Sequence, residues 1–126
     1  MASSSELQYP NMRVELIHCL KKLSDHEYQQ AAWVRGEYPP NVAYDDLDFS
    51  IRFLFDDTSL EEDSKGYVGV ILKNEEEARA VDEVISALNL IFKKYQEDMS
   101  DEEYIALEEW QDVLSASQKA LKVIKD

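Results

Sequence analysis

The sequence predicts an α+β fold in one domain: a helical hairpin, a short antiparallel β-sheet of at least two strands, and a C-terminal helical hairpin. Apolar residues recur at helical spacing on both sides of a central stretch, and they alternate with polar residues inside it. Helix-type and strand-type segments are grouped rather than interleaved, which favours α+β. We expect residues 1–9 to form a flexible N-terminal tail and residues 10–126 to form a single α+β domain.

The N-terminal helical hairpin is expected between residues 10 and 34. Pro10 or Asn11 begins the first helix, in which apolar side chains follow a helical period. Ser24 and Glu27 have the spacing of a capping box, with Ser24 at the N-cap. A second helix is therefore expected to run from this box to about Val34.

The stretch YDDLDFSIRFLFDDT, from Tyr44 to Thr58, is the expected first strand. Leu47, Phe49, Ile51, Phe53 and Phe55 fall on every second position, and the polar residues Asp46, Asp48, Ser50, Arg52 and Asp56 fall between them. This alternation is typical of a strand with one buried face. After an acidic turn that ends at Gly66, residues 67–72 form the expected second strand, and the two strands are expected to pair as an antiparallel hairpin.

The C-terminal hairpin begins with a long helix that Asn74 is expected to cap, with acids in its first turn and Lys93 and Lys94 in its last. The buried side chains expected in this helix are Val81, Val84, Ile85, Leu88, Ile91, Phe92 and Tyr95. Ser100 and Glu103 form a second capping box. The last helix that follows carries Tyr104, Leu107, Trp110, Leu114, Leu121 and Ile124.

The net charge is −14, and it disfavours binding to nucleic acids and to anionic membranes. No apolar run approaches the roughly twenty residues that cross a bilayer. The N-terminus lacks the basic and apolar regions of a signal peptide, so we expect a cytoplasmic protein.

The negative charge is concentrated in two segments. Residues 37–63 contain nine acids and one base, and residues 97–112 contain eight acids and no base. Tyrosines lie beside these acids, and this combination suits a partner protein that is rich in arginine or lysine. The candidate partner-binding residues are Asp45, Asp46, Asp48, Asp56, Asp57, Tyr38, Tyr44, Glu102, Glu103, Glu108 and Glu109.

Three other interpretations of the acidic residues remain open. Asp46 and Asp48 are expected on one face of the strand, where paired carboxylates bind metal ions, so the carboxylates from Asp45 to Asp57 could serve a metal-dependent hydrolase. The chain could also be a subunit of a homo-oligomer such as a homodimer, or its acidity could serve solubility alone.

No catalytic residue, metal ligand or cofactor is assigned, because no known catalytic or nucleotide-binding motif is found. His18 and His26 lack the spacing of a zinc site, and Cys19 is expected to be a buried, inert thiol.

Short motifs along the N-terminal two thirds of the chain resemble a family of small, uncharacterised bacterial proteins that are common in actinomycetes. The motifs are Leu23-Ser24-Asp25, Trp33-Val34, Tyr38-Pro39, Tyr44-Asp45-Asp46-Leu47-Asp48 and Asp56-Asp57-Thr58. The resemblance covers about residues 12–96, and its most specific part runs from Tyr44 to Thr58. It implies a bacterial cytosolic protein of one domain, and it implies no activity.

The function we expect is that of a non-catalytic acidic protein-binding module. Its most specific form is an immunity or antitoxin-like protein that neutralises a basic toxin, such as a nuclease, by presenting acidic and aromatic surface to the positive active-site cleft of the toxin.

Overall fold

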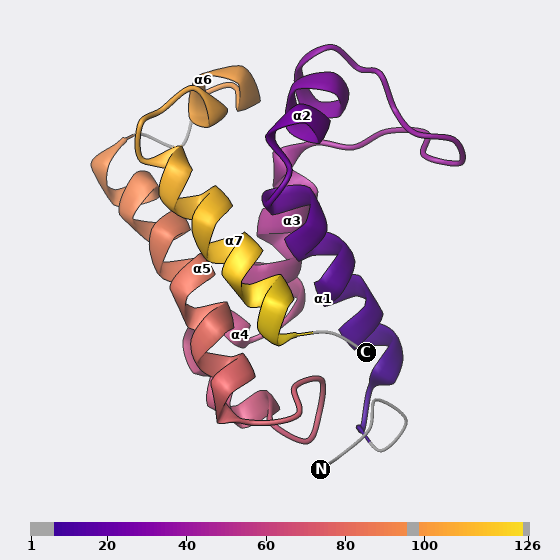
Figure 1. Cartoon of the computed structure of the whole chain (residues 1–126), viewed down its shortest axis with the longest axis vertical. Helices are drawn as coiled ribbons and strands as arrows, with labels where there is room; N and C mark the ends of the chain where they lie inside the picture. Colours follow the sequence, from indigo (N-terminus) through magenta and orange to yellow (C-terminus); the bar gives the residue numbers. More distant parts are fainter. Residues whose placement is uncertain (1–6, 96–98, 125–126) are drawn as a thin grey trace.

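The computed structural model describes residues 7–95 and 99–124 of the chain (Figure 1). Helices connected by turns and loops make up these residues, and none of them belongs to a β-strand. The chain is therefore all-α, and the predicted α+β fold with a β-sheet is wrong.

Three long helices form the frame of the molecule: α1 (Pro10–Leu23), α5 (Glu75–Lys94) and α7 (Trp110–Val123). Each has an apolar face at helical spacing, such as Leu16, Leu20 and Leu23 in α1, and these faces are buried together. α7 packs against both α1 and α5 and lies between them (Figure 1).

The expected first strand is a helix, α3 (Leu47–Arg52), which continues as the π-helix η3 (Phe53–Asp57). Asp46 starts the helix as its N-cap, because its carboxylate accepts a hydrogen bond from the backbone N–H of Phe49 at 3.2 Å. In a strand with alternating faces Phe49 would be buried and Leu54 exposed. Phe49 is instead 49% exposed and Leu54 is fully buried, at helical spacing from Leu47.

The expected second strand is also absent. The short helix α4 (Leu60–Asp63) and the 3₁₀-helix η4 (Ser64–Tyr67) precede it, and residues 68–72 form a tight turn with one isolated β-bridge. Ile71 and Leu72 are consecutive and both fully buried, which an alternating strand does not allow.

The second N-terminal helix forms as expected, in two parts: α2 (His26–Tyr28) and the π-helix η2 (Gln29–Val34). Its cap differs from the prediction. Asp25 accepts the hydrogen bond from the backbone N–H of Tyr28 at 3.0 Å, while the hydroxyl of Ser24 donates back to the carbonyl of Lys21. Ser24 therefore closes α1, and Asp25 opens α2.

The first described residues are attached to the turn at residues 68–72. The side chain of Leu7 is buried, and the backbone N–H groups of Gln8 and Tyr9 donate to the carbonyl groups of Gly69 and Val70 at 3.1 and 2.9 Å. Residues 1–6 of the expected flexible tail lie outside the described residues.

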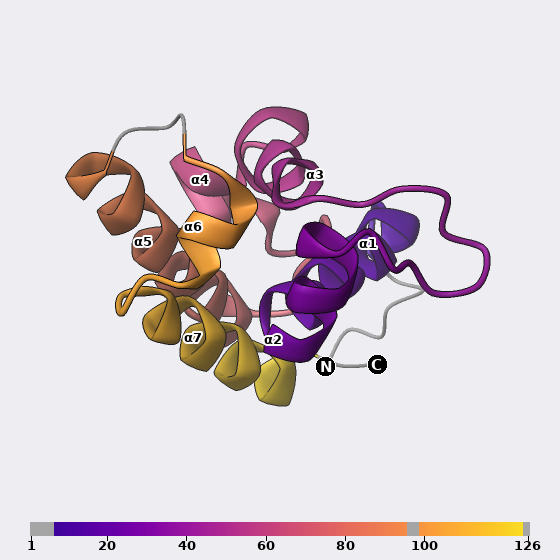
Figure 2. The same ribbon diagram turned by 90° about the horizontal axis from the view of Figure 1, so that it is seen from above.

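The C-terminal half contains the expected capping motifs. Asn74 caps α5, and Ser100 and Glu103 form the predicted capping box. The last helix is divided into α6 (Asp101–Ile105) and α7, with a turn between them. Seen from above, α6 lies between α5 and α2 (Figure 2).

A buried ion pair connects α1 to α5. The guanidinium of Arg13 donates two hydrogen bonds to the carboxylate of Glu77, at 2.8 and 2.9 Å, and a third to the carbonyl of Ile71 at 3.0 Å. The backbone N–H of Lys73 also donates to Glu77. These hydrogen bonds compensate for removing both charges from water.

Candidate functional site

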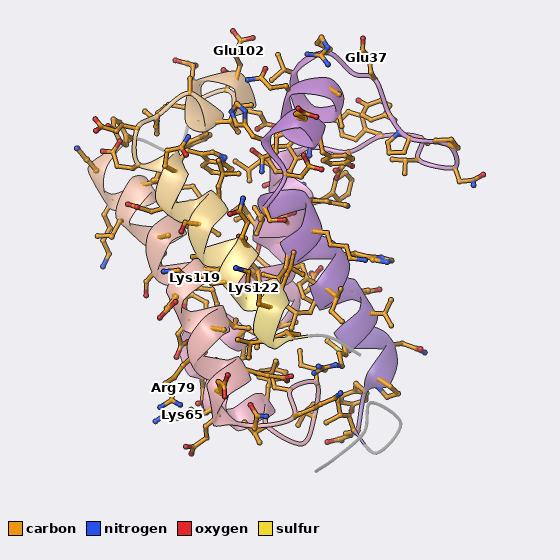
Figure 3. All side chains as sticks on the ribbon, viewed as in Figure 1. Glu37, Lys65, Arg79, Glu102, Lys119 and Lys122 are labelled. Atoms are coloured by element: carbon orange, nitrogen blue, oxygen red, sulfur yellow. The ribbon has the colours of Figure 1, made fainter. Side chains whose placement is uncertain are left out.

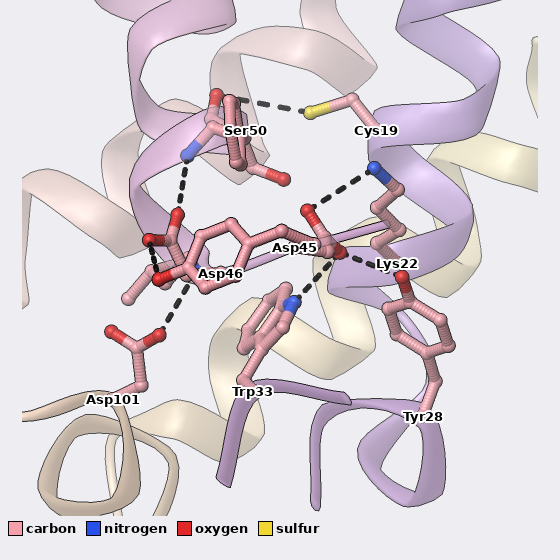
Figure 4. Close-up of polar contacts among 11 residues, drawn as sticks. Cys19, Lys22, Tyr28, Trp33, Asp45, Asp46, Ser50 and Asp101 are labelled. Atoms are coloured by element: carbon pink, nitrogen blue, oxygen red, sulfur yellow. Dashed lines mark hydrogen bonds and ion pairs between the residues drawn. The ribbon is translucent and has the colours of Figure 1, made fainter. Parts of the chain in front are cut away.

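Asp45 lies in the interior rather than on a binding surface, with a side chain that is 3% exposed (Figure 4). Its carboxylate accepts hydrogen bonds from the hydroxyl of Tyr28 at 2.6 Å, the indole N–H of Trp33 at 2.9 Å and the ammonium of Lys22 at 3.4 Å. The desolvation of Tyr28 and its bond to Asp45 raise the pKa of the Tyr28 hydroxyl. Asp45 therefore attaches the loop before α3 to α1 and α2.

The two acidic segments meet at the N-terminus of α3. Asp46 caps this helix, and the carboxylate of Asp101, which belongs to α6, accepts a hydrogen bond from the backbone N–H of Leu47 at 3.0 Å (Figure 4). Residues 97 and 98 of the second segment lie outside the described residues. The meeting point brings residues more than fifty positions apart in sequence into one site.

The titration of Asp101 is affected by this arrangement. Desolvation raises the pKa of its carboxyl group above the usual value, and the negative charges of Asp46, Asp48 and Asp45 raise it further. The hydrogen bond from Leu47 acts in the opposite direction. Among the described residues no lysine, arginine or histidine forms an ion pair with Asp101.

A cleft of about 570 Å³ opens beside this meeting point, between α3, η3, α4, α5 and α6. We call it the α3 cleft. Its apolar walls are formed by Leu47, Ile51, Phe55, Phe92, Met99 and Tyr104. Its polar and charged lining consists of Asp48, Asp56, Glu61, Asp101, Asn89 and Lys93. Four carboxylates and one ammonium group thus surround an aromatic interior.

Three aromatic rings in the cleft wall contact one another in a row. The centroid of Phe92 lies 6.1 Å from that of Phe55 and 5.8 Å from that of Tyr104, with planes crossed at 72° and 86°. These edge-to-face contacts come from η3, α5 and α6. The row therefore joins three elements that are distant in sequence.

A second hollow, of about 380 Å³, lies on the opposite side of α3, toward α1. Its lining includes Asp57, His18, Cys19, Tyr44 and Phe49. Cys19 is buried as expected, and burial raises the pKa of its thiol to about 12. At neutral pH this thiol is uncharged, which agrees with the predicted inert role.

The two tyrosines predicted to bind a partner lie near this second hollow. The ring of Tyr44 is 5.8 Å from that of Tyr38 and 6.0 Å from that of Phe49. Tyr44 is 58% exposed, and its hydroxyl donates to Asp46 at 2.8 Å. The aspartates and tyrosines of the prediction are thus divided between two sides of α3.

The four predicted glutamates lie outside both hollows. Glu103 belongs to the capping box, and Glu109 accepts hydrogen bonds from Lys94 at 2.6 Å and from the hydroxyl of Tyr95 at 2.9 Å. The bond from Lys94 is the main cause of the lowered pKa of Glu109. Glu102 and Glu108 are exposed to solvent.

The expectation that Asp46 and Asp48 lie on one face of a strand is wrong. Asp46 is the N-cap of α3, and Asp48 lies in the first turn of that helix. Asp48 forms an exposed ion pair with Arg52 at 2.8 Å. Within residues 7–95 and 99–124, no three histidine, cysteine, aspartate or glutamate residues are placed to hold a metal ion together.

Asp101, Glu61 and Phe92 line the cleft but are not among the residues that the sequence predicts to bind a partner. The sequence pattern places Phe92 in the core and distinguishes neither Asp101 nor Glu61 from the other acids of their segments. Asp101 lies in the first turn after the predicted capping box, and an acid at that position favours its own helix N-terminus, so it gives no signal of a contact with α3. The packing of α6 beside α3 could not be read from either segment alone.

The sequence model of a domain family described as "Domain of unknown function (DUF7945)" matches residues 7–126. This agrees with the expected family without an established activity, and the match extends through the acidic C-terminal portion. No curated protein and no solved structure matches the chain. None of the helices in the described ranges is both long and apolar enough to cross a membrane.

Proposed function

We propose that this chain, which belongs to the DUF7945 family, is a non-catalytic protein-binding module whose α3 cleft receives a basic segment of a partner protein. The observation that carries the proposal is the meeting of the two acidic segments at a cleft with an aromatic interior. This combination provides both of the contributions that protein interfaces need, which are apolar anchoring and complementary charge.

The apolar walls of the cleft supply a place for anchor residues. Phe55 and Phe92 in the cleft wall are only partly covered by the rest of the chain, so a partner side chain that enters removes further aromatic surface from water. Such buried anchors contribute most of the binding free energy at protein interfaces.

The carboxylates of the cleft select the charge of the partner. Asp48, Asp56, Glu61 and Asp101 outnumber Lys93, and the whole chain carries a net charge of −14. Figure 3 shows Glu102 and Glu37 at one end of the molecule and Lys65 and Arg79 at the other. The negative field of the whole chain attracts a basic partner, and the association is accelerated at low ionic strength.

The more specific form of this proposal is an immunity or antitoxin-like protein in the cytoplasm that neutralises a basic toxin, such as a nuclease. An acidic surface that occupies the positive active-site cleft of a nuclease competes directly with the phosphates of its substrate. The high density of carboxylates and the small size of the domain support this form.

The test is capture of partners from the native cytosol at low salt, followed by elution with a salt gradient and mass spectrometry. The cleft variant Asp56→Lys/Glu61→Lys is compared with Glu83→Lys/Asp112→Lys, which changes the net charge equally at exposed acids outside the cleft. A basic protein that binds the wild type and the control is expected to lose at least about tenfold in affinity for the cleft variant, mainly through slower association.

Equal binding of the purified partner to both variants would show that only the overall charge matters and would contradict a role for the cleft. Recovery of no basic protein with the wild type would contradict the proposed function itself. Thermal unfolding of each variant checks that the fold is preserved, since all four positions are exposed.

A further inference from the structure

We infer that the α3 cleft is an arginine pocket, in which the guanidinium of a partner arginine lies beside Asp101 and Asp48 and its aliphatic stem lies against Phe92 and Tyr104. This inference rests on the proposed function and identifies the side chain that the cleft recognises. Arginine suits the site because its planar cation contacts carboxylates and aromatic rings at the same time.

The carboxylate of Asp101 provides the electrostatic half of the pocket. It is partly buried in the cleft lining, and the negative charges of Asp46, Asp48 and Asp45 act on it. No cation of the described chain forms an ion pair with it. A guanidinium in the cleft would supply the missing opposite charge and would stabilise the ionised carboxylate.

The aromatic row provides the apolar half. Phe92 lies between Phe55 and Tyr104 with crossed planes, and the rings of Phe55 and Phe92 are only partly buried in the wall. A guanidinium over a ring face gains cation–π attraction, and the methylene groups of the stem cover the adjoining apolar surface. Leu47 and Ile51 continue this surface along α3.

The volume of the cleft, about 570 Å³, lies within the range of about 300 to 1,000 Å³ that is common for ligand pockets. One arginine with parts of its neighbouring residues can therefore enter. The charged groups that face the cleft from η3, α4 and α5 are Asp56, Glu61 and Lys93. Of these, the two acids are available to further basic residues of the partner.

The test uses a short blocked peptide of arginine and leucine residues as the probe, and measures its binding to the full-length chain by calorimetry at low salt. Matched peptides replace arginine by citrulline, which keeps the shape and removes the charge, or by lysine. We expect the citrulline peptide to bind at least about tenfold more weakly, and the lysine peptide to bind more weakly than the arginine peptide, because lysine lacks the planar fork.

Two variants that each remove one negative charge separate a specific role of Asp101 from general electrostatics. Asp101→Asn keeps an acceptor for the N–H of Leu47, and Asp112→Asn changes an exposed acid outside the cleft. We expect Asp101→Asn to weaken binding of the arginine peptide about tenfold and Asp112→Asn to change it less than about twofold.

The pH dependence gives a second measurement in the wild type. Binding of a cation favours the ionised carboxylate, so the affinity should fall as the pH is lowered through the raised pKa of Asp101. The pKa itself, followed by carboxyl-carbon NMR, should decrease when the arginine peptide is added.

The arginine pocket is overturned if the peptide binds Asp101→Asn and Asp112→Asn equally, or if the pKa of Asp101 does not change on binding. The proposed function survives that result as long as the cleft variant Asp56→Lys/Glu61→Lys still loses its basic partner. If neither the arginine nor the lysine peptide binds the wild type and no basic partner is recovered, both proposals fail.

Discussion

At the scale of single residues, Asp45 shows how an acid in an acidic chain acquires a structural role. Its neighbours Asp46 and Asp48 are at least partly exposed, yet Asp45 is buried with three donors around it. The donors come from α1, α2 and η2, so one carboxylate holds three elements against the loop before α3. The indole of Trp33 is itself buried in the core, where its hydrogen bond has no replacement from water.

We predict that Asp45→Ala lowers the free energy of unfolding by about 2 to 3 kcal/mol, because it leaves the N–H of Trp33 and the hydroxyl of Tyr28 without their acceptor. Urea denaturation followed by tryptophan fluorescence measures the change. Asp57→Ala, at an exposed aspartate, is the control and should change stability by less than about 0.5 kcal/mol. Equal effects of the two substitutions would contradict the structural role of Asp45.

At the scale of the element, α3 explains why the predicted sheet is absent. The five apolar residues of the stretch do alternate, but Leu54 falls between two of them and does not fit the polar face. The helix buries Leu54 together with Leu47 and Phe53 and leaves Phe49 in solvent. Asp46 also stabilises the start of the helix as its N-cap, and the alternation of apolar residues gives no indication of this cap.

Substitutions at Leu54 and Phe49 distinguish the burial pattern of the helix from that of the predicted strand. We predict that Leu54→Ala lowers the free energy of unfolding by about 3 kcal/mol, because it opens a cavity at a fully buried position. Phe49→Ala should cost less than about 1 kcal/mol, because the ring is half exposed. Chemical denaturation of both variants measures the difference. The reverse order would support the strand and contradict the helix.

The elements that sequence predicted well are those with local signals. Asn74 and the pair Ser100 and Glu103 mark helix starts through contacts within three residues, and the structure confirms them. The α3 cleft depends on packing between α3, α5 and α6, which no local pattern encodes. Asp48 and Asp56 could therefore be predicted as partner-binding residues from the sequence. That Asp101 and Phe92 line the same cleft could not.

At the scale of the whole molecule, charge is distributed unevenly over a small surface. Acids and bases balance in residues 1–36, whereas the loop before α3, η3 and α6 carry most of the excess negative charge. Folding brings these segments together at the α3 cleft and increases their mutual repulsion. The closely paired Arg13 and Glu77 are shielded from solvent ions by burial.

We predict that adding sodium chloride raises the midpoint of thermal unfolding, by about 4 °C between low and high salt, because it screens the repulsion among the acids. Differential scanning calorimetry measures this shift. The variant Glu83→Lys/Asp112→Lys, which carries less negative charge, should show a smaller shift. A midpoint that falls with salt would mean that attractive ion pairs outweigh the repulsion.

The position of α7 between α1 and α5 also bears on how the protein is synthesised. The indole of Trp110 donates to the side chain of Gln29, a residue more than eighty positions earlier, and α7 covers the apolar face of α1. The ribosome delivers α1 well before α7, so Leu16, Leu20 and Leu23 lack the cover of α7 on the nascent chain until that helix has emerged. The core of the domain is therefore complete only after α7 has left the ribosome.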